Sequence, residues 1–167
     1  CSGTEETLTV NCDRQGLEEL PSNFPEVSRN ISLAENYITR ISNGAFTGLS
    51  NLVSLNLAWN RITVLQKDTF MGLSSLAKLV LAGNPLTIDT LEKSVFDGIQ
   101  NHMPTLKELS LEDMYIPLRS QSLKPLRGSS MESLIFRAND FNCDLPGDAF
   151  SGLTLKYLDI SRNMKLK

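Results

Sequence analysis

An eleven-residue pattern recurs six times along the chain and severely limits the folds open to it. The pattern is L-x-x-L-x-L-x-x-N-x-φ, in which φ is an apolar residue, and it is clearest in NLVSLNLAWNRI and SLAKLVLAGNPL. The copies start near residues 28, 52, 76, 106, 131 and 155, so successive copies are 24, 24, 30, 25 and 24 residues apart. Because one such unit cannot bury its own leucines, we expect the units to stack and share a core.

A second pattern accompanies the first at the same spacing. It reads AFTGL at 45–49, TFMGL at 69–73, VFDGI at 95–99 and AFSGL at 149–153. Two linked patterns with a period in the twenties are typical of the leucine-rich repeat. We therefore predict an α/β solenoid: a leucine-rich-repeat horseshoe with a parallel β-sheet on the concave side and irregular loops on the convex side. The phenylalanines of the second pattern should fill the convex part of the core, and the glycines that follow them should allow a tight bend.

The asparagine of the repeat is expected to leave the strand and pair with backbone groups of neighbouring coils. The fourth copy, LKELSLEDMYI, has Met114 at this position. This loss predicts a buried backbone group left unpaired, at about 1–3 kcal/mol, unless the chain shifts or a water substitutes. The same copy has SLKPL at 122–126 in place of the phenylalanine pattern and follows the 30-residue unit. We therefore expect altered curvature and a docking place for a partner between residues 85 and 130.

The cysteines bear on domain organisation and on the cellular compartment. We predict an N-terminal cysteine cap over residues 1–27 and six repeats over residues 28–167. A disulfide between Cys1 and Cys12 would stabilise the cap by about 3 kcal/mol; the alternative is two reduced thiols in a cytosolic protein. Cys143 either pairs with a cysteine beyond residue 167, is a buried thiol, or is unpaired. Asn30 begins the only N-glycosylation sequon of the chain, Asn30-Ile31-Ser32.

Composition and charge argue against several classes of function. A net charge of -3 gives no attraction for a nucleic-acid backbone, and no apolar run approaches the roughly 18 residues that cross a membrane. One histidine, no metal-ligand spacing, no phosphate-binding glycine loop and no nucleophile motif predict no enzyme, no metal and no cofactor. His102, in the long third unit, is expected to be solvated and inert; the alternative is a response to mildly acidic pH in endosomes.

The chain resembles the ectodomain of a Toll-like receptor. The resemblance rests on the two-cysteine cap, CSGTEETLTVNCDRQGLEELPSNFP, and on the uneven repeat lengths. It implies the extracellular ligand-recognition module of an innate-immune pattern-recognition receptor, which binds a microbial ligand or protein partner and forms receptor homodimers or heterodimers. It also implies a single-pass membrane protein of the cell surface or endosome, with the membrane segment outside this chain.

Two further expectations accompany this resemblance. The chain stops just after the sixth strand without a C-terminal cap, so we expect an N-terminal fragment of a longer ectodomain. The alternative function is a secreted or matrix leucine-rich-repeat protein that acts as an adhesion or binding module.

Outward-facing positions of the strands give a candidate binding patch, because aromatic and arginine side chains are enriched at binding hot spots. The candidate residues are Trp59, Lys78, Val80, Glu108, Glu112, Asp113, Ile135, Arg137, Tyr157 and Asp159. The alternative is that Trp59 packs along the neighbouring coil and that the charges pair across strands. We expect Trp59→Ala and Arg137→Glu to weaken binding without unfolding the chain. The concave face offers on the order of 240 Å², well short of the roughly 800 Å² per partner of a standard interface, so a protein partner would also need the edges or loops.

Overall fold

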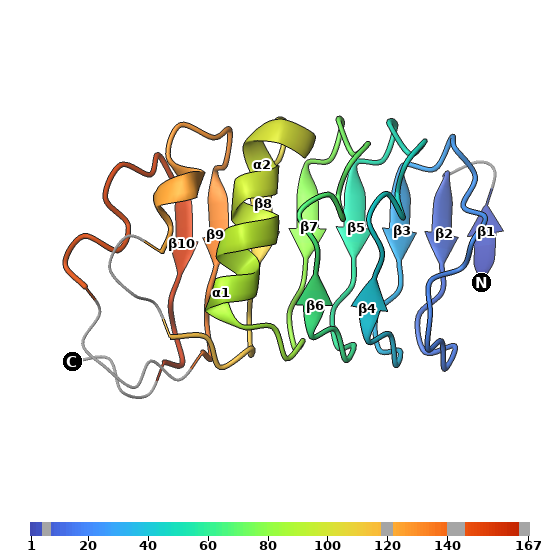
Figure 1. Ribbon diagram of the computed structural model, residues 1–167, viewed down its shortest axis with the longest axis horizontal. Helices are drawn as coiled ribbons and strands as arrows, with labels where there is room; N and C mark the ends of the chain where they lie inside the picture. The colour runs from blue at the N-terminus through green and yellow to red at the C-terminus, as the bar shows by residue number, and fades with distance from the viewer. Residues whose placement is uncertain (5–7, 118–121, 140–145, 164–167) are drawn as a thin grey trace.

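An eight-stranded sheet runs the length of the molecule in the computed structural model, which describes residues 1–4, 8–117, 122–139 and 146–163 (Figure 1). Its order is β1-β2-β3-β5-β7-β8-β9-β10. The only antiparallel pair in this sheet is β1 with β2; its remaining neighbours pair in parallel. The strands are Ser2–Thr4 (β1), Thr9–Asn11 (β2), Asn30–Ser32 (β3), Ser54–Asn56 (β5), Lys78–Val80 (β7), Glu108–Ser110 (β8), Ser133–Ile135 (β9) and Tyr157–Asp159 (β10). The predicted leucine-rich-repeat solenoid is confirmed.

Each repeat contributes one short strand because its L-x-L segment alternates inward and outward. In β3, β5, β7, β8 and β9 the central residue is buried and pairs in register with the central residue of the next strand of the sheet. Two residues further on, a second apolar side chain is buried in each of these coils. The stacked pairs form one continuous core from the cap to the fifth coil: Ile31, Leu33, Leu55, Leu57, Leu79, Leu81, Leu109, Leu111, Leu134 and Phe136.

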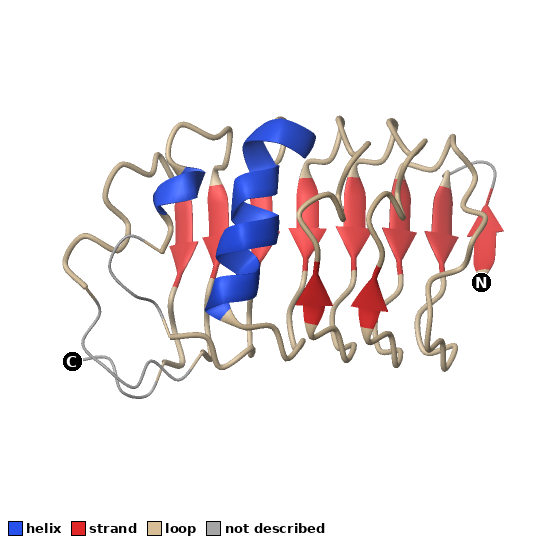
Figure 2. Cartoon of the chain, viewed as in Figure 1, coloured by secondary structure: helices blue, strands red, loops and turns tan. Residues whose placement is uncertain are grey.

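The convex side holds more regular structure than the predicted loops. A two-stranded parallel sheet is formed by β4, Arg40–Ile41, and β6, Val64–Leu65. The third unit, which is six residues longer than the two units before it, forms a helical segment made of α1 (Ile88–Thr90), the π-helix η1 (Leu91–Phe96) and α2 (Asp97–His102) (Figure 2). A short 3-10 helix, η2, spans Lys124–Leu126. The added length is thus absorbed as a helix on the convex face.

The convex phenylalanines fill the core as expected, with one difference at their glycines. Phe46 and Phe70 are buried and stack with ring centroids 6.1 Å apart. Gly72 has φ +98°, and a Cβ there would lie 3.2 Å from the Cα of Thr47, so the bend requires glycine. Gly98 instead lies inside α2 without a positive φ, so the predicted tight bend is wrong there. The reason is that the longer third unit makes a helix at this point.

Asparagine side chains bridge successive coils as the repeat predicts. The amide of Asn60 donates to the carbonyls of Leu33 at 2.9 Å and Leu57 at 3.1 Å, and its oxygen accepts the N–H of Ile38 at 3.1 Å. The equivalent asparagines of the other coils make the same kind of bridge: Asn36, Asn84, Asn139 and Asn163.

Met114 breaks this row without leaving the expected unpaired backbone group. The N–H of Leu86, which would face an asparagine at position 114, donates instead to the carbonyl of Asn84 at 2.8 Å. β8 keeps its register with β7 and β9, so the loss of the asparagine does not interrupt the strand pairing of the fourth coil. What remains irregular is the loop after the strand, where Tyr115 has φ +55° and is 75% exposed.

The N-terminal segment joins the sheet through β2 and is tied by a disulfide. Cys1 and Cys12 are bonded with their Cα atoms 4.2 Å apart, and Cys12 lies in the core. This contact anchors the start of the chain to the first repeat. Cys143 and residues 164–167 lie outside the described residues.

Candidate binding surfaces

Strand register arranges the outward residues of the concave sheet in rows across the coils. One row runs from Asn30 to Tyr157, and a second row runs from Ser32 to Asp159. Within the second row, Ser110 of β8 separates the predicted apolar residues Val80 and Ile135. Both are half-buried, so they do not form one apolar patch.

Charged candidates pair with one another across strands. The ammonium of Lys78 lies 2.7 Å from Glu108, its partner in register. Arg137 Nε lies 2.6 Å from Glu112 Oε1, and this carboxylate raises the pKa of the guanidinium. Four of the ten predicted residues are therefore engaged with one another, which is the alternative that the sequence left open.

The two candidates on β10 lie at the end of the sheet. Tyr157 is 54% exposed. The pKa of Asp159 is lowered by hydrogen bonds from the side chain and backbone N–H of Ser161, with a smaller contribution from Arg137. Asp159 is thus held as an anion within its own turn.

Trp59 packs along the next coil and still remains 48% exposed. A Cβ added to Gly83 would lie 2.3 Å from Cε3 of the indole, so the ring occupies the space that a side chain at position 83 would fill. The backbone fixes this arrangement, because Trp59 has φ +56° and its N–H donates to the carbonyl of Ala82 at 2.7 Å. In three coils the residue just before the position that Trp59 occupies is a buried alanine. Ala34, Ala58 and Ala82 form a separate buried cluster, and Val80 packs against it.

A surface that the sequence reading missed lies beside the asparagine row, where the strands give way to loops. Tyr37 is 48% exposed, and the guanidinium of Arg61 lies 4.3 Å from its ring centroid. Tyr115 occupies the equivalent position two coils after Arg61. We name Tyr37, Trp59, Arg61 and Tyr115 the aromatic edge. Trp59 was already a predicted residue. The other three directly follow the asparagine position of their repeat, which the repeat leaves variable: Tyr37, Arg61 and Tyr115.

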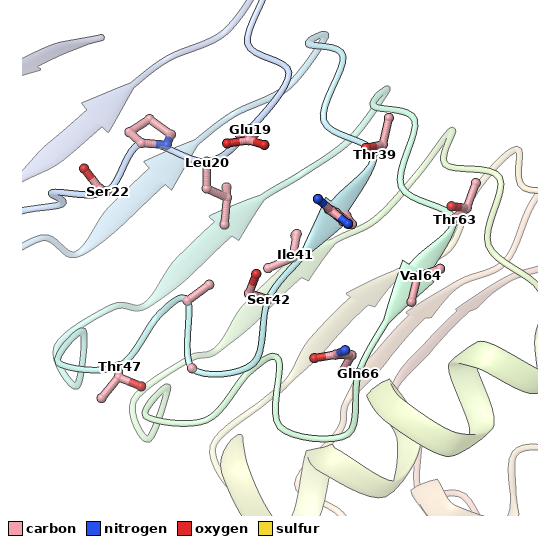
Figure 3. Close-up of a pocket in the computed structure, with 14 residues that line it drawn as sticks. Glu19, Leu20, Ser22, Thr39, Ile41, Ser42, Thr47, Thr63, Val64 and Gln66 are labelled. Carbon is pink, nitrogen blue, oxygen red and sulfur yellow. The ribbon is translucent and has the colours of Figure 1, made fainter.

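A shallow groove lies on the convex side, between the cap and the first two coils (Figure 3). Its volume is about 810 Å³, and Glu19, Leu20, Thr39, Arg40 and Val64 are among its lining residues. The lining is mixed, with hydroxyl groups, one acid and one base. The sequence did not predict this groove.

Asn30 and His102 are two further residues that the sequence singled out. Asn30 is exposed on β3 of the concave sheet, and its amide donates to the hydroxyl of Thr9 at 3.2 Å. His102 ends α2, and its Nε2 lies 3.1 Å from Asp68 Oδ1 of the preceding coil. The expectation of a solvated loop histidine is therefore wrong, because α2 places His102 against that coil.

The described residues contain no group of three or more histidine, cysteine, aspartate or glutamate side chains placed to hold a metal ion. Within those same residues, no helix has the length and apolar character needed to cross a membrane.

Comparison with known proteins supports the leucine-rich-repeat fold. A family model described as leucine rich repeat matches residues 29–86. A stretch of 56 residues is 36% identical to the chondroadherin-like protein of Mus musculus and covers 34% of this chain and 8% of that protein.

Two solved structures share the fold along most of the chain. Human 5T4 (Wnt-activated inhibitory factor 1, trophoblast glycoprotein) has a TM-score of 0.79 and 28% identity, over 98% of this chain and 62% of that one. The TLR13 of a TLR13-ssRNA13 complex has a TM-score of 0.68 and 25% identity, over 92% of this chain and 25% of that one. The chain therefore spans less than two thirds of the length of each of these relatives. Its repeat pattern, its sheet and these likenesses show that the chain has a leucine-rich-repeat fold.

Proposed function

We propose that this chain is the ligand-recognition part of a Toll-like receptor, facing the outside of the cell and binding a microbial ligand or a second receptor chain. The observation that carries the proposal is the combination of a two-cysteine cap with uneven coils, one of them extended by a convex helix. The likeness to TLR13 over 92% of the chain supports it. Proteins of this fold generally bind ligands or other proteins rather than catalyse reactions.

An extracellular location is supported by the chemistry of the cap. A disulfide persists in oxidising compartments and is rare in the cytosol. Asn30 is exposed within its sequon, so an N-glycan is compatible with the folded chain. We propose that Asn30 is glycosylated and that the chain is a glycoprotein, reaching the membrane through a segment outside residues 1–167.

An adhesion or matrix protein is the second candidate. It is favoured by the likeness to the chondroadherin-like protein and by the TM-score of 0.79 to human 5T4, a trophoblast glycoprotein. Both candidates use the solenoid as a binding module. They differ in whether a signalling segment belongs to the same protein.

The charges of this chain argue against RNA, the ligand named in the TLR13 complex, as its own ligand. Nucleic-acid affinity comes largely from lysine and arginine side chains that neutralise phosphates. Here the net charge is -3, and Arg14, Lys78 and Arg137 are each paired with a carboxylate. We propose a partner that is not a nucleic acid.

Within the predicted concave patch, the paired charges are best suited to a polar rim. Arg137→Glu would bring two carboxylates together at Glu112, so it would perturb the fold as well as any binding. Arg137→Gln removes the charge without adding repulsion and is the better substitution at this position, alongside Trp59→Ala.

The full transcript tests the proposal directly. We expect the reading frame to continue beyond residue 167 into further repeats, a membrane span and a cytoplasmic signalling domain. Ligand-dependent output from that full-length protein in a reporter cell would support the receptor. A frame that ends after further repeats without a membrane span would overturn it in favour of the secreted module.

A further inference from the structure

The aromatic edge combines exposed rings with a rigid support. The residue before each asparagine position has a left-handed φ, including Glu35, Trp59 and Asp113. The N–H of each donates to a carbonyl of the next coil: Ala58, Ala82 and Arg137 respectively. The loops that carry the rings are thus hydrogen-bonded from coil to coil, and little ordering is required when a ligand binds.

Two of the three rings are also held by neighbouring groups, and the third is largely presented to solvent. Trp59 lies against Gly83, whose missing side chain gives the indole its place. Arg61 stacks on Tyr37 at 4.3 Å. Tyr115 is 75% exposed. The three rings present their faces to solvent along this loop edge, and the tyrosine hydroxyls and the guanidinium of Arg61 add hydrogen-bonding groups.

The edge carries balanced charge. Arg14 and Glu35 form a two-fold hydrogen-bonded pair at 2.8 and 2.6 Å, and this pair lowers the pKa of Glu35. At the positions directly before and after the asparagine position in the first four coils, the other charged residues are Arg61 and Asp113. Together with Arg14 and Glu35 they give two positive and two negative charges, which cancel. A balanced edge offers no counterion-release gain to a polyanion.

The size of the edge points to a small, extended ligand. From the coil of Tyr37 to that of Tyr115 there are three coil steps, about 14 Å at the usual strand spacing of about 4.8 Å. A strip about 14 Å long offers much less surface than the roughly 800 Å² that each partner buries in a standard protein interface. It matches a short linear chain of rings, each able to lie against an aromatic side chain.

We propose that the aromatic edge binds a neutral oligosaccharide. Sugar rings present C–H faces to Trp59, Tyr37 and Tyr115, while their hydroxyl groups meet the Tyr hydroxyls, Arg61 and Asp113. The proposal rests on the proposed role of the chain as a recognition module and names its ligand class. A microbial surface polysaccharide and a host glycan share this chemistry.

Binding can be followed through the chain itself, because Trp59 is its only tryptophan. The purified 167-residue chain is titrated with cellohexaose, chitohexaose and mannohexaose, and with a single-stranded RNA oligonucleotide, by calorimetry and tryptophan fluorescence. We expect at least one hexasaccharide to bind with a change in the emission of Trp59, and the RNA not to bind. Which hexasaccharide binds distinguishes a chitin-like or mannan-like source from a glucan.

Substitutions on and off the edge assign the site. Tyr115→Ala should lower saccharide affinity about tenfold, as expected for loss of an aromatic anchor, and calorimetry should show a similar loss for Trp59→Ala. Met71→Ala is the control, since Met71 is an exposed large side chain that belongs neither to the aromatic edge nor to the predicted concave patch; the saccharide affinity of this variant should not change. Circular dichroism confirms that each variant is folded.

Several outcomes would overturn the inference. They are the absence of calorimetric heat with all three hexasaccharides, tighter binding of the RNA, and full affinity in folded Trp59→Ala and Tyr115→Ala. None of these touches the transcript result on which the receptor proposal depends, so the two can fail separately.

Discussion

Single residues show how far a repeat pattern predicts hydrogen bonds. Each asparagine of the repeat bridges coils as expected, because its position after the strand leaves it no other buried partners. At Met114 the sequence showed that the asparagine is missing, but it did not determine how the backbone N–H of Leu86 is satisfied. Whether Leu86 N–H would find the carbonyl of Asn84 depends on the local backbone turn. A side chain alone does not determine that turn.

At this scale we predict that Asn60→Met destabilises the fold by about 1–3 kcal/mol, because the buried N–H of Ile38 loses its acceptor. The measurement is the urea midpoint at constant slope. Asn51→Met is the control, since Asn51 is exposed. Equal midpoints for both variants would mean that any coil can adopt the turn seen at Leu86.

Elements show where extra sequence is placed. The third unit, with its six added residues, forms α1, η1 and α2 on the convex side, while β7, β8 and β9 keep a common register. Backbone pairing in the sheet is continuous and costly to interrupt, whereas the convex side tolerates a longer path. The π-helix and the contact of His102 with Asp68 follow from this packing, and neither has a signature in the sequence.

The cap supplies the prediction at the scale of elements. Reducing agent should lower the melting temperature, because the Cys1–Cys12 bond ties β1 and β2 to the core; the loop-entropy contribution is about 3 kcal/mol. Thermal melts with and without reductant measure the shift. The same shift in a chain carrying Cys143→Ser assigns it to the cap. An unchanged melt would mean that this bond does not support the fold.

The whole molecule is held by one long core, and several carboxylates outside that core accept hydrogen bonds from neighbouring groups. Glu35 is hydrogen-bonded by Arg14, Glu132 by Lys156 and Asp159 by Ser161, and each contact lowers the pKa of the carboxyl group. A lowered folded-state pKa means that the unfolded chain binds protons first as the pH falls. The stabilisation is therefore complete above the ordinary carboxyl range and is lost as pH falls through the folded-state values.

We accordingly predict that the urea midpoint is constant near neutral pH and decreases between about pH 5 and pH 3. Arg14→Met should reduce this decrease, because Glu35 then titrates nearer its ordinary range. A midpoint that does not change over the acid range would show that these exposed pairs contribute nothing to stability.

The sequence by itself determined the solenoid, the buried leucines and the asparagine bridges, because a periodic pattern repeats the same local environment. Only the tertiary structure decided which outward side chains are available. Cross-strand partners engage Lys78, Glu108, Glu112 and Arg137, and the indole of Trp59 depends on a glycine one coil away. The aromatic edge emerged in the same way. Residues separated by more than twenty positions become neighbours only through stacking, and side-chain availability is a property of those neighbours.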